Sequence, residues 1–407
     1  MLADERLQDA TREIQLNRMD VGQTGSSDIT DLTDLLTMVL RSRFDVSARD
    51  TVRLWLADRA AVEWQPFCEL VERSRLAPLV LYILHEEQLP LQLREAFQVS
   101  ARSNRLRSVV ILSELSSLLS GLESTNLSAI VLKGGALAET VYPRSDTRPL
   151  GDIDLLVKPS DLERVHQLLV QSGFRPWAPE THAGAHEAFE NEKVYRKSRR
   201  VAIEVDVHWS LFDSPYYQNK ISMDWFWETS QTMQVDGRSP MRVLGTEAQI
   251  IHLCGHLCLH HEGVELFWLH DVAEVVHAHK EVINWATVLD RAREFELILP
   301  LRQILNRVAA DWRIDIPASV LSKLDSLEPS AQEKRIFAWL TATNPPPAQR
   351  LWADIRSLPQ WSQRLRFLWS NLLPSPAYMR QRYGVRHSAL LPFYYPYRWY
   401  RGLRDIS

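Results

Sequence analysis

Apolar and polar positions follow two different periods along this chain, and the changes between them divide the sequence. From residue 29 to about 122, apolar residues recur at helical spacing, and residues 93–124 are predicted to form one long amphipathic helix. Residues 126–212 instead combine short β-branched runs with turn residues, and helical spacing returns after residue 245. The pattern predicts an α+β fold, a small mixed sheet flanked by N-terminal and C-terminal helical regions.

The central region is predicted to contain a strand, a turn and a helix, followed by further strands. The run "AIVL" ends at a glycine pair and is followed by the helix-forming residues "ALAETVY". "DIDLLV" is a second strand, and "KVYR", the charged turn "KSRR" and "VAIEVDVHW" are typical of a hairpin. Together these elements predict a compact α/β unit in the middle of the chain.

The same pattern divides the chain into five parts. We expect disorder in residues 1–27, a helical N-terminal region in 28–125 and an α/β core in 126–240. A helical domain in 241–356 and a basic aromatic segment in 357–407 complete the prediction.

Composition and charge narrow the class of protein. The net charge of −4 excludes a chain that is a polycation along its whole length. Three cysteines without regular spacing fit a reducing compartment, so a cytoplasmic location is expected. No apolar run approaches the ~18 residues of a membrane helix, and the polar, acidic N-terminus is unlike a secretory signal. The oligomeric state is left open.

The strand "RPLGDIDLLV" carries the first candidate chemistry. Side chains alternate along a strand, so Asp152 and Asp154 point the same way, ~6.6 Å apart. Two carboxylates on one face suit Mg²⁺, which takes oxygen ligands and in pairs can clamp a phosphoryl transfer. Taken alone, such a pair is more often found at a strand end or a helix cap.

Two further motifs extend this carboxylate pair. Gly134 and Gly135 allow backbone N–H groups to approach a phosphate at a helix N-terminus, although a tight turn without a ligand explains them equally well. In "AIEVDVHW", alternation places Glu204, Asp206 and His208 on the face opposite the core. Asp206 could complete a metal site and accept the proton of an attacking hydroxyl.

Two cations lie beside these motifs in the sequence. Lys133 precedes the glycine pair, and Arg148 precedes the aspartate pair. Either could neutralise triphosphate charge, although lysine and arginine are also common surface residues.

The motifs "VLKGGAL", "RPLGDIDLLV" and "EVDVHWSL" together resemble the polymerase-β-like nucleotidyltransferase superfamily. They are similar, more narrowly, to its bacterial family of uncharacterised nucleotidyltransferases, over about residues 128–212. The spacer from Gly135 to Asp152 is longer than in many members, and Glu204 rivals Asp206 as the third acid.

The resemblance implies an activity and a set of roles. A nucleoside monophosphate would pass from an NTP to an unidentified hydroxyl acceptor, a small molecule or a protein, by Mg²⁺-dependent in-line attack, with two Mg²⁺ ions. The implied roles fall into a catalytic and metal-binding set and a nucleotide-binding set: Asp152, Asp154 and Asp206 in the first, Lys133, Gly134, Gly135 and Arg148 in the second.

Two other functions remain open. A catalytically silent protein could keep this fold for binding or assembly. An RNA-directed nucleotidyltransferase would require a basic surface and salt-sensitive binding, which the net charge of −4 does not favour.

The histidine-rich stretch "IHLCGHLCLHH" is predicted to be a packed helix. His252, His256 and His260 share one helical face, and Cys254 and Cys258 lie on another, so one tetrahedral zinc cannot take its four ligands from both faces. A zinc site built from the histidines would need a carboxylate such as Asp271, which is otherwise expected at a helix N-cap. We expect one or two histidines, His256 among them, to face the active-site cleft beside Glu204 and His208.

The C-terminal segment allows two interpretations. Its arginines and aromatic residues could bind nucleic acid by phosphate contacts and stacking. The favoured interpretation is that its Trp and Tyr side chains pack on the core while its arginines remain solvated.

Overall fold

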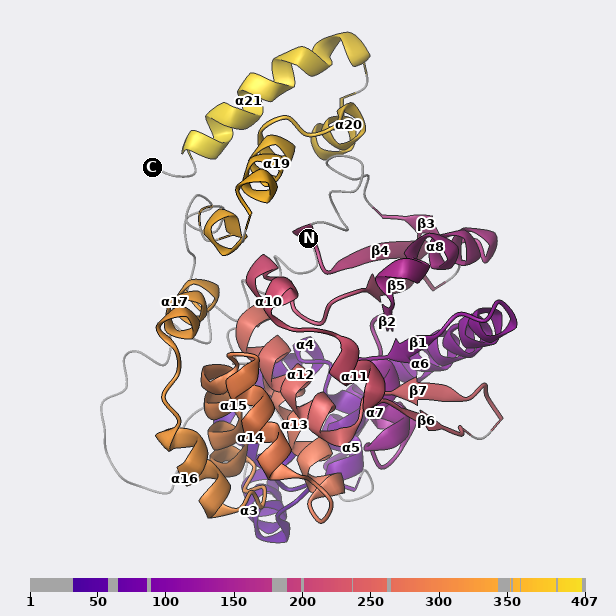
Figure 1. Cartoon of the computed structure of the whole chain (residues 1–407). Helices are drawn as coiled ribbons and strands as arrows, with labels where there is room; N and C mark the ends of the chain where they lie inside the picture. Colours follow the sequence, from indigo (N-terminus) through magenta and orange to yellow (C-terminus); the bar gives the residue numbers. More distant parts are fainter. Residues whose placement is uncertain are drawn as a thin grey trace.

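The structure is a computed structural model that describes most of the chain (Figure 1). The described residues are 32–57, 65–85, 89–177, 189–198, 201–235, 237–261, 265–342, 352, 354–358, 360–385 and 387–404. The disorder expected for residues 1–27 lies outside these ranges. No helix among them has the length and apolar character needed to cross a bilayer.

A seven-stranded mixed sheet forms the centre of the molecule, which confirms the predicted fold class. Its spatial order is β3-β4-β5-β2-β1-β7-β6. The strands are β1 (Ala129–Val131), β2 (Ile153–Val157), β3 (Arg175–Pro176), β4 (Glu192–Lys197), β5 (Ile203–His208), β6 (Gln231–Met233) and β7 (Met241–Val243). The predicted hairpin is present as the antiparallel pair β4–β5.

The pairing of β2 with β5 sets the geometry of the site. The two strands are parallel, and Asp154 is the register partner of Asp206. On its other side β2 pairs antiparallel with β1, which in turn pairs parallel with β7. The two acidic motifs therefore lie on adjacent central strands.

Helices cover both faces of the sheet. Short helices and 3-10 turns connect its strands: α7 (Lys133–Thr140), η3 (Ser145–Thr147), η4 (Pro159–Asp161), α8 (Leu162–Gln171), α10 (Pro215–Lys220) and α11 (Asp224–Glu228). One face buries Val131, Leu155 and Val205 against α8 and α6. The alternate positions Ile130 and Leu156 pack instead into the core of the helical regions. Asp154 and Asp206 alternate with the first set, so they face the helical regions.

The two helical regions share one hydrophobic core, which joins residues 35–97 to residues 244–336. The N-terminal helices are α2 (Leu32–Arg41), α3 (Val46–Ala57), α4 (Gln65–Arg73), α5 (Ala77–Ile83) and α6 (Leu91–Ser124). The later ones are α12 (Thr246–His260), α13 (Leu266–His279), α14 (Trp285–Glu294), α15 (Ile298–Asp311), α16 (Ala318–Ser326) and α17 (Ala331–Leu340). The long helix predicted over residues 93–124 is confirmed as α6.

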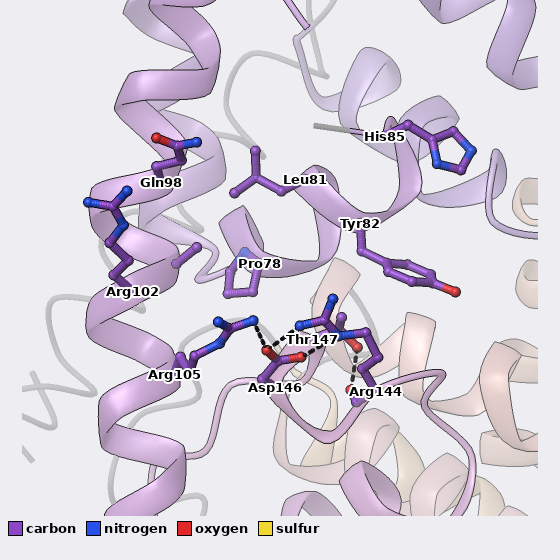
Figure 2. A pocket seen from close by; sticks show the side chains of 11 residues that line it. Pro78, Leu81, Tyr82, His85, Gln98, Arg102, Arg105, Arg144, Asp146 and Thr147 are labelled. Carbon is purple, nitrogen blue, oxygen red and sulfur yellow. Dashed lines mark hydrogen bonds and ion pairs between the residues drawn. The ribbon is translucent and has the colours of Figure 1, made fainter. Parts of the chain in front are cut away.

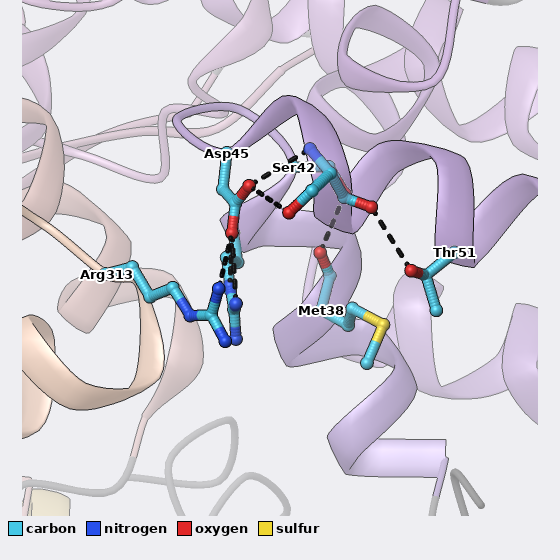
Figure 3. A network of polar contacts seen from close by, with 7 residues as sticks. Met38, Ser42, Asp45, Thr51 and Arg313 are labelled. Carbon is cyan, nitrogen blue, oxygen red and sulfur yellow. Dashed lines mark hydrogen bonds and ion pairs between the residues drawn. The ribbon is translucent and has the colours of Figure 1, made fainter. Parts of the chain in front are cut away.

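A polar network also ties the two helical regions together (Figure 3). Asp45, between α2 and α3, accepts hydrogen bonds from Ser47 and Arg41. It also forms an ion pair with Arg313, which follows α15. The hydrogen bonds from Ser47 and the charge of Arg41 lower the pKa of Asp45 to about 2. Next to it, Arg43 forms a salt bridge with the fully buried Glu274 of α13.

The C-terminal segment forms the helices α19 (Trp361–Leu372), α20 (Pro376–Tyr383) and α21 (Leu391–Arg404), with the 3-10 turn η5 (Ser388–Leu390) before α21. Figure 1 shows them, coloured from orange at α19 to yellow at α21, projecting beyond the sheet and the helical regions. The prediction that their aromatic residues pack on the core is wrong for many of them, since Trp361, Trp369 and Phe393 are largely exposed. They have a small core of their own around Met379, Val385 and Leu391.

Candidate active site

The three predicted catalytic carboxylates lie together at β2 and β5. Asp152 directly precedes β2, Asp154 is its second residue, and Asp206 occupies the partner position on β5. Asp154 is 4% exposed, while Asp152 and Asp206 are half-buried. The structure thus brings the three predicted side chains to one region of the sheet, on the face that meets the helical regions.

Lys133 is bound directly to this cluster. Its Nζ lies 2.8 Å from Oδ1 of Asp154. Its backbone has a φ of +43°, a left-handed conformation that is costly for a residue with a Cβ and is often found at functional sites. Only Leu132 separates the end of β1 from this residue, so the sharp turn directs the lysine toward β2.

His208 joins the cluster from β5 and connects it to a residue that the sequence did not single out. Its Nε2 lies 2.9 Å from Oδ1 of Asp154, and its Nδ1 lies 3.0 Å from Oε2 of Glu192. Glu192 is the register partner of His208 on β4, so the hairpin pairing was the signal that could have identified it. The imidazole can donate to both carboxylates only when both ring nitrogens carry a proton.

The three carboxylates have different electrostatic environments. Burial raises the pKa of Asp154, but Lys133 and the hydrogen bond from His208 outweigh it and hold that pKa far below its usual range. Burial and the charge of Asp154 raise the pKa of Asp152 to about 6. Burial and the charges of Asp154 and Asp152 raise the pKa of Asp206 to about 9. Two of the three carboxylates therefore lack a sufficient counter-charge.

This imbalance fits a cation ligand at Asp152 and Asp206. The Oδ1 atom of Asp206 is buried and has no hydrogen-bond partner among the described residues, which is costly unless another group binds it. Oxygen donors are the ligands that Mg²⁺ prefers. Within the described ranges, no three His, Cys, Asp or Glu side chains already have the arrangement of a metal site. A cation shared by all three aspartates therefore requires their side chains to reorient, because Lys133 and His208 hold Asp154.

The glycine pair lies inside a helix rather than in a turn before it. α7 begins at Lys133, so Gly134 and Gly135 occupy its first turn, where backbone N–H groups lack helical acceptors. A Cβ on Gly134 would overlap Nη1 of Arg148, so this glycine is also needed for the guanidinium to pack. Close packing and phosphate approach are both compatible with Gly134.

Arg148 is held in a buried ion pair. Its Nη2 lies 2.7 Å and its Nε 3.2 Å from the two carboxylate oxygens of Asp271, in α13. The hydroxyl of Tyr142 donates to the same carboxylate at 2.7 Å, and the ring of Phe267 lies under the guanidinium. The prediction that Asp271 caps a helix is wrong, because it lies inside α13 and is fully buried. Its role depends on Arg148, 123 positions earlier, which no local pattern indicates.

Glu204 and Asp206 are distinguished by their partners. Glu204 forms an ion pair with Arg196 across the hairpin. Asp206 is the register partner of Asp154. The geometry therefore favours Asp206 as the third carboxylate of the cluster.

The histidine face of α12 lies near the same cluster. The rings of His256 and His260 stack with centroids 4.8 Å apart, and the ring of His261 lies tilted against that of Trp268 with centroids 3.7 Å apart. Burial and the charge of Lys133 hold the pKa of His256 well below its usual range, so the ring is neutral. At the C-terminal end of α12, Nε2 of His260 accepts a hydrogen bond from the backbone N–H of Asp213.

A separate cavity of about 440 Å³ lies among α5, α6 and η3 (Figure 2). Arg105 and Arg144 both bind Asp146 at its edge, and Arg102 also lines it. The residues that line this cavity do not include Asp152, Asp154 or Asp206.

Comparison with known families decides the assignment of the chain. The family model described as "Uncharacterised nucleotidyltransferase" matches residues 60–312, more than half of the chain. This protein belongs to the uncharacterised nucleotidyltransferase family. The resemblance to the uncharacterised nucleotidyltransferases is thereby confirmed, and all three motifs lie inside the matched residues.

Other comparisons are more distant. An antigenic nucleotidyltransferase-like protein from Paracoccidioides brasiliensis is 16% identical, with a TM-score of 0.34. The similarity covers 53% of this chain and 95% of the fungal chain. No curated protein matches the sequence.

Proposed function

We propose that this protein transfers a nucleoside monophosphate from an NTP to a hydroxyl acceptor in a Mg²⁺-dependent reaction. The observation that carries the proposal is the carboxylate cluster, in which Asp206 has an unpartnered buried oxygen beside Asp154. A buried carboxylate oxygen that has neither a hydrogen-bond donor nor a ligand only destabilises the folded protein. Cation binding gives it a function, which also argues against a silent scaffold.

The residues of the chain divide the work of the reaction. Asp152, Asp154 and Asp206 would hold Mg²⁺, which when bound supplies positive charge to the phosphate oxygens. The first N–H groups of α7, at Gly134 and Gly135, would bind the phosphates of the NTP.

Two cations and one base complete the site. Lys133 would add positive charge beside the phosphates, and Arg148, paired with Asp271, would act on the nucleotide site by packing against Gly134 in the first turn of α7. Asp206 would accept the proton of the acceptor hydroxyl. The acceptor oxygen attacks the α-phosphorus in line, and the bond to pyrophosphate breaks. We also propose that the protein belongs to the polymerase-β-like superfamily and acts in the cytoplasm.

Radiolabel transfer tests the proposal. The protein is incubated with each α-³²P-NTP, Mg²⁺ and a cell extract, beside an Asp152→Asn/Asp154→Asn variant. We expect label on an acceptor with the wild type and at least a 100-fold loss with the variant, since the charge of the site is removed. Asp290→Asn, at an exposed position of α14, is the matched control and should label normally.

The outcomes separate the alternatives. Equal labelling by the double variant would contradict the carboxylate mechanism. No labelling from any NTP or extract fraction would favour the silent binding protein. Label that is lost after ribonuclease treatment would identify an RNA-directed enzyme.

A further inference from the structure

Helix α19 turns an apolar stripe toward solvent. Trp361, Leu365, Trp369 and Leu372 follow one another at helical spacing and are 73%, 55%, 60% and 44% exposed. The opposite side of the helix is the buried one, at Phe367 and Ser370. A helix of a globular protein normally buries its apolar stripe, so this stripe lacks a partner among the described residues.

Helix α21 repeats the arrangement. Phe393, Tyr397 and Tyr400 are spaced by four and three residues and are 73%, 47% and 63% exposed. Leu391 at the start of the helix is buried with Met379, so the exposed residues are not simply an unpacked end. Two consecutive long helices of the segment thus present large apolar side chains to solvent.

Hydrogen bonds hold the two helices together. Arg398 donates to the carbonyl of Asn371, and the indole N–H of Trp399 donates to the carbonyl of Leu372 at 2.8 Å. The hydroxyl of Tyr395 donates to the carbonyl of Pro374. The carbonyls of Asn371 and Leu372 lie in the last turn of α19, where carbonyls lack helical partners, and Pro374 follows the end of the helix. The two stripes therefore belong to one pre-organised unit.

The charge of the segment is opposite to that of the remaining chain. Residues 357–407 contain eight arginines, no lysine and one aspartate, a net charge of +7 in a chain of −4. The other 356 residues therefore carry −11. An anionic surface would attract this end of the molecule and repel the rest, which would orient the protein on it.

We propose that α19–α21 bind the surface of an anionic lipid bilayer, with their apolar stripes in the headgroup and acyl boundary. Tryptophan, tyrosine and phenylalanine beside arginine on an amphipathic helix are the composition that suits this depth of the bilayer. The acidic sheet and helical regions would remain in water. The segment also lies outside residues 60–312, the part matched by the family model, so the proposal does not rest on nucleotidyl transfer.

Other occupants fit the segment less well. Two copies of a +7 segment would repel each other if they met face to face. Single-stranded nucleic acid would use the arginines and aromatic rings, but it gives no reason for the exposed leucines Leu365 and Leu372. A bilayer accounts for the arginines, the aromatic rings and the leucines together.

Vesicle flotation with the full chain tests the proposal. We expect binding to vesicles with 30 mol% phosphatidylglycerol in phosphatidylcholine, weaker binding at high salt, and little binding to phosphatidylcholine alone. Trp361→Ala/Trp369→Ala/Phe393→Ala should lower the partition coefficient at least tenfold. Arg380→Gln and Arg401→Gln should each lower it about fivefold and reduce its salt dependence.

The control removes exposed apolar side chains elsewhere in equal number. Leu54→Ala/Val99→Ala/Val282→Ala changes residues that are about as exposed but lie outside the segment, and it should bind vesicles as the wild type does. The proposal is overturned if the protein does not float with anionic vesicles, or if both triple variants lose binding equally. It is also overturned by a sedimenting dimer that the stripe variant abolishes, or by poly(U) binding without vesicle binding. The melting temperatures of the variants are measured as well. Values equal to that of the wild type show that a loss of vesicle binding does not come from misfolding.

Discussion

At the scale of single residues, Asp206 is the least compensated charge of the candidate site. Its pKa is raised to about 9, chiefly by burial and then by Asp154, so the folded protein holds a proton that the unfolded chain releases above about pH 4. The folded state thus binds more protons than the unfolded state between about pH 4 and 9. The contribution of Asp206 to stability therefore falls as pH rises through that window.

We expect Asp206→Asn to stabilise the metal-free protein. At pH 8 in EDTA the neutral amide should raise the free energy of unfolding by about 1–3 kcal/mol, because asparagine, unlike Asp206, gains no free energy of ionisation when the chain unfolds. Urea denaturation measures the change. Added Mg²⁺ should raise the melting temperature of the wild type and leave that of the variant unchanged. Equal stabilisation of both by Mg²⁺ would contradict a role of Asp206 in cation binding.

Asp154→Asn is the control of opposite sign. The pKa of Asp154 is lowered, because Lys133 and His208 outweigh its burial, so its contribution is present above its unfolded pKa and lost as pH falls. Removing this charge leaves the half-buried Lys133 without its partner and should destabilise the protein at pH 8.

At the scale of elements, the turn from β1 into α7 combines a left-handed Lys133 with two buried glycines. The Cβ position of Gly134 is taken by the guanidinium of Arg148, and Asp271 prevents that group from moving aside. The packing of the first turn of α7 thus depends on Asp271, a residue of the distant helix α13. The sequence indicates the turn, but it does not show what fills the space beside it.

Gly134→Ala should therefore destabilise the fold by about 1–3 kcal/mol, the usual cost of overpacking. The matched control is Gly121→Ala in α6, where the added Cβ would lie 3.4 Å from Leu168, an ordinary contact. There alanine should be neutral or stabilising by up to about 1 kcal/mol, because it favours the helix. Thermal and urea denaturation of both variants check the difference. Similar effects at the two positions would show that Arg148 yields to the added methyl group.

At the scale of the whole molecule, the buried pair between Arg148 and Asp271 joins the segment before β2 to the later helices. Both side chains are almost fully buried, so neither has water to replace its partner. Asp271→Asn should destabilise the protein by about 3–5 kcal/mol, since it leaves the guanidinium uncompensated. Asp311→Asn, which breaks the more exposed pair with Arg307, should cost at most about 1 kcal/mol. Urea denaturation compares the two, and a similar small loss in both would mean that the buried pair is not a structural link.

Features that depend only on neighbouring residues can be predicted from the amino-acid sequence. The β-branched runs, the shared strand face of Asp152 and Asp154 and that of Glu204 and Asp206, and the helical periods all follow from backbone geometry. They indicated the α+β fold, the long helix α6 and the hairpin β4–β5. Which charged side chains meet depends on the tertiary fold, because contacts such as Arg148 with Asp271 join positions 123 residues apart. The tertiary fold also decided that the aromatic side chains of α19 and α21 are exposed, since an amphipathic pattern defines an apolar face but not what covers it.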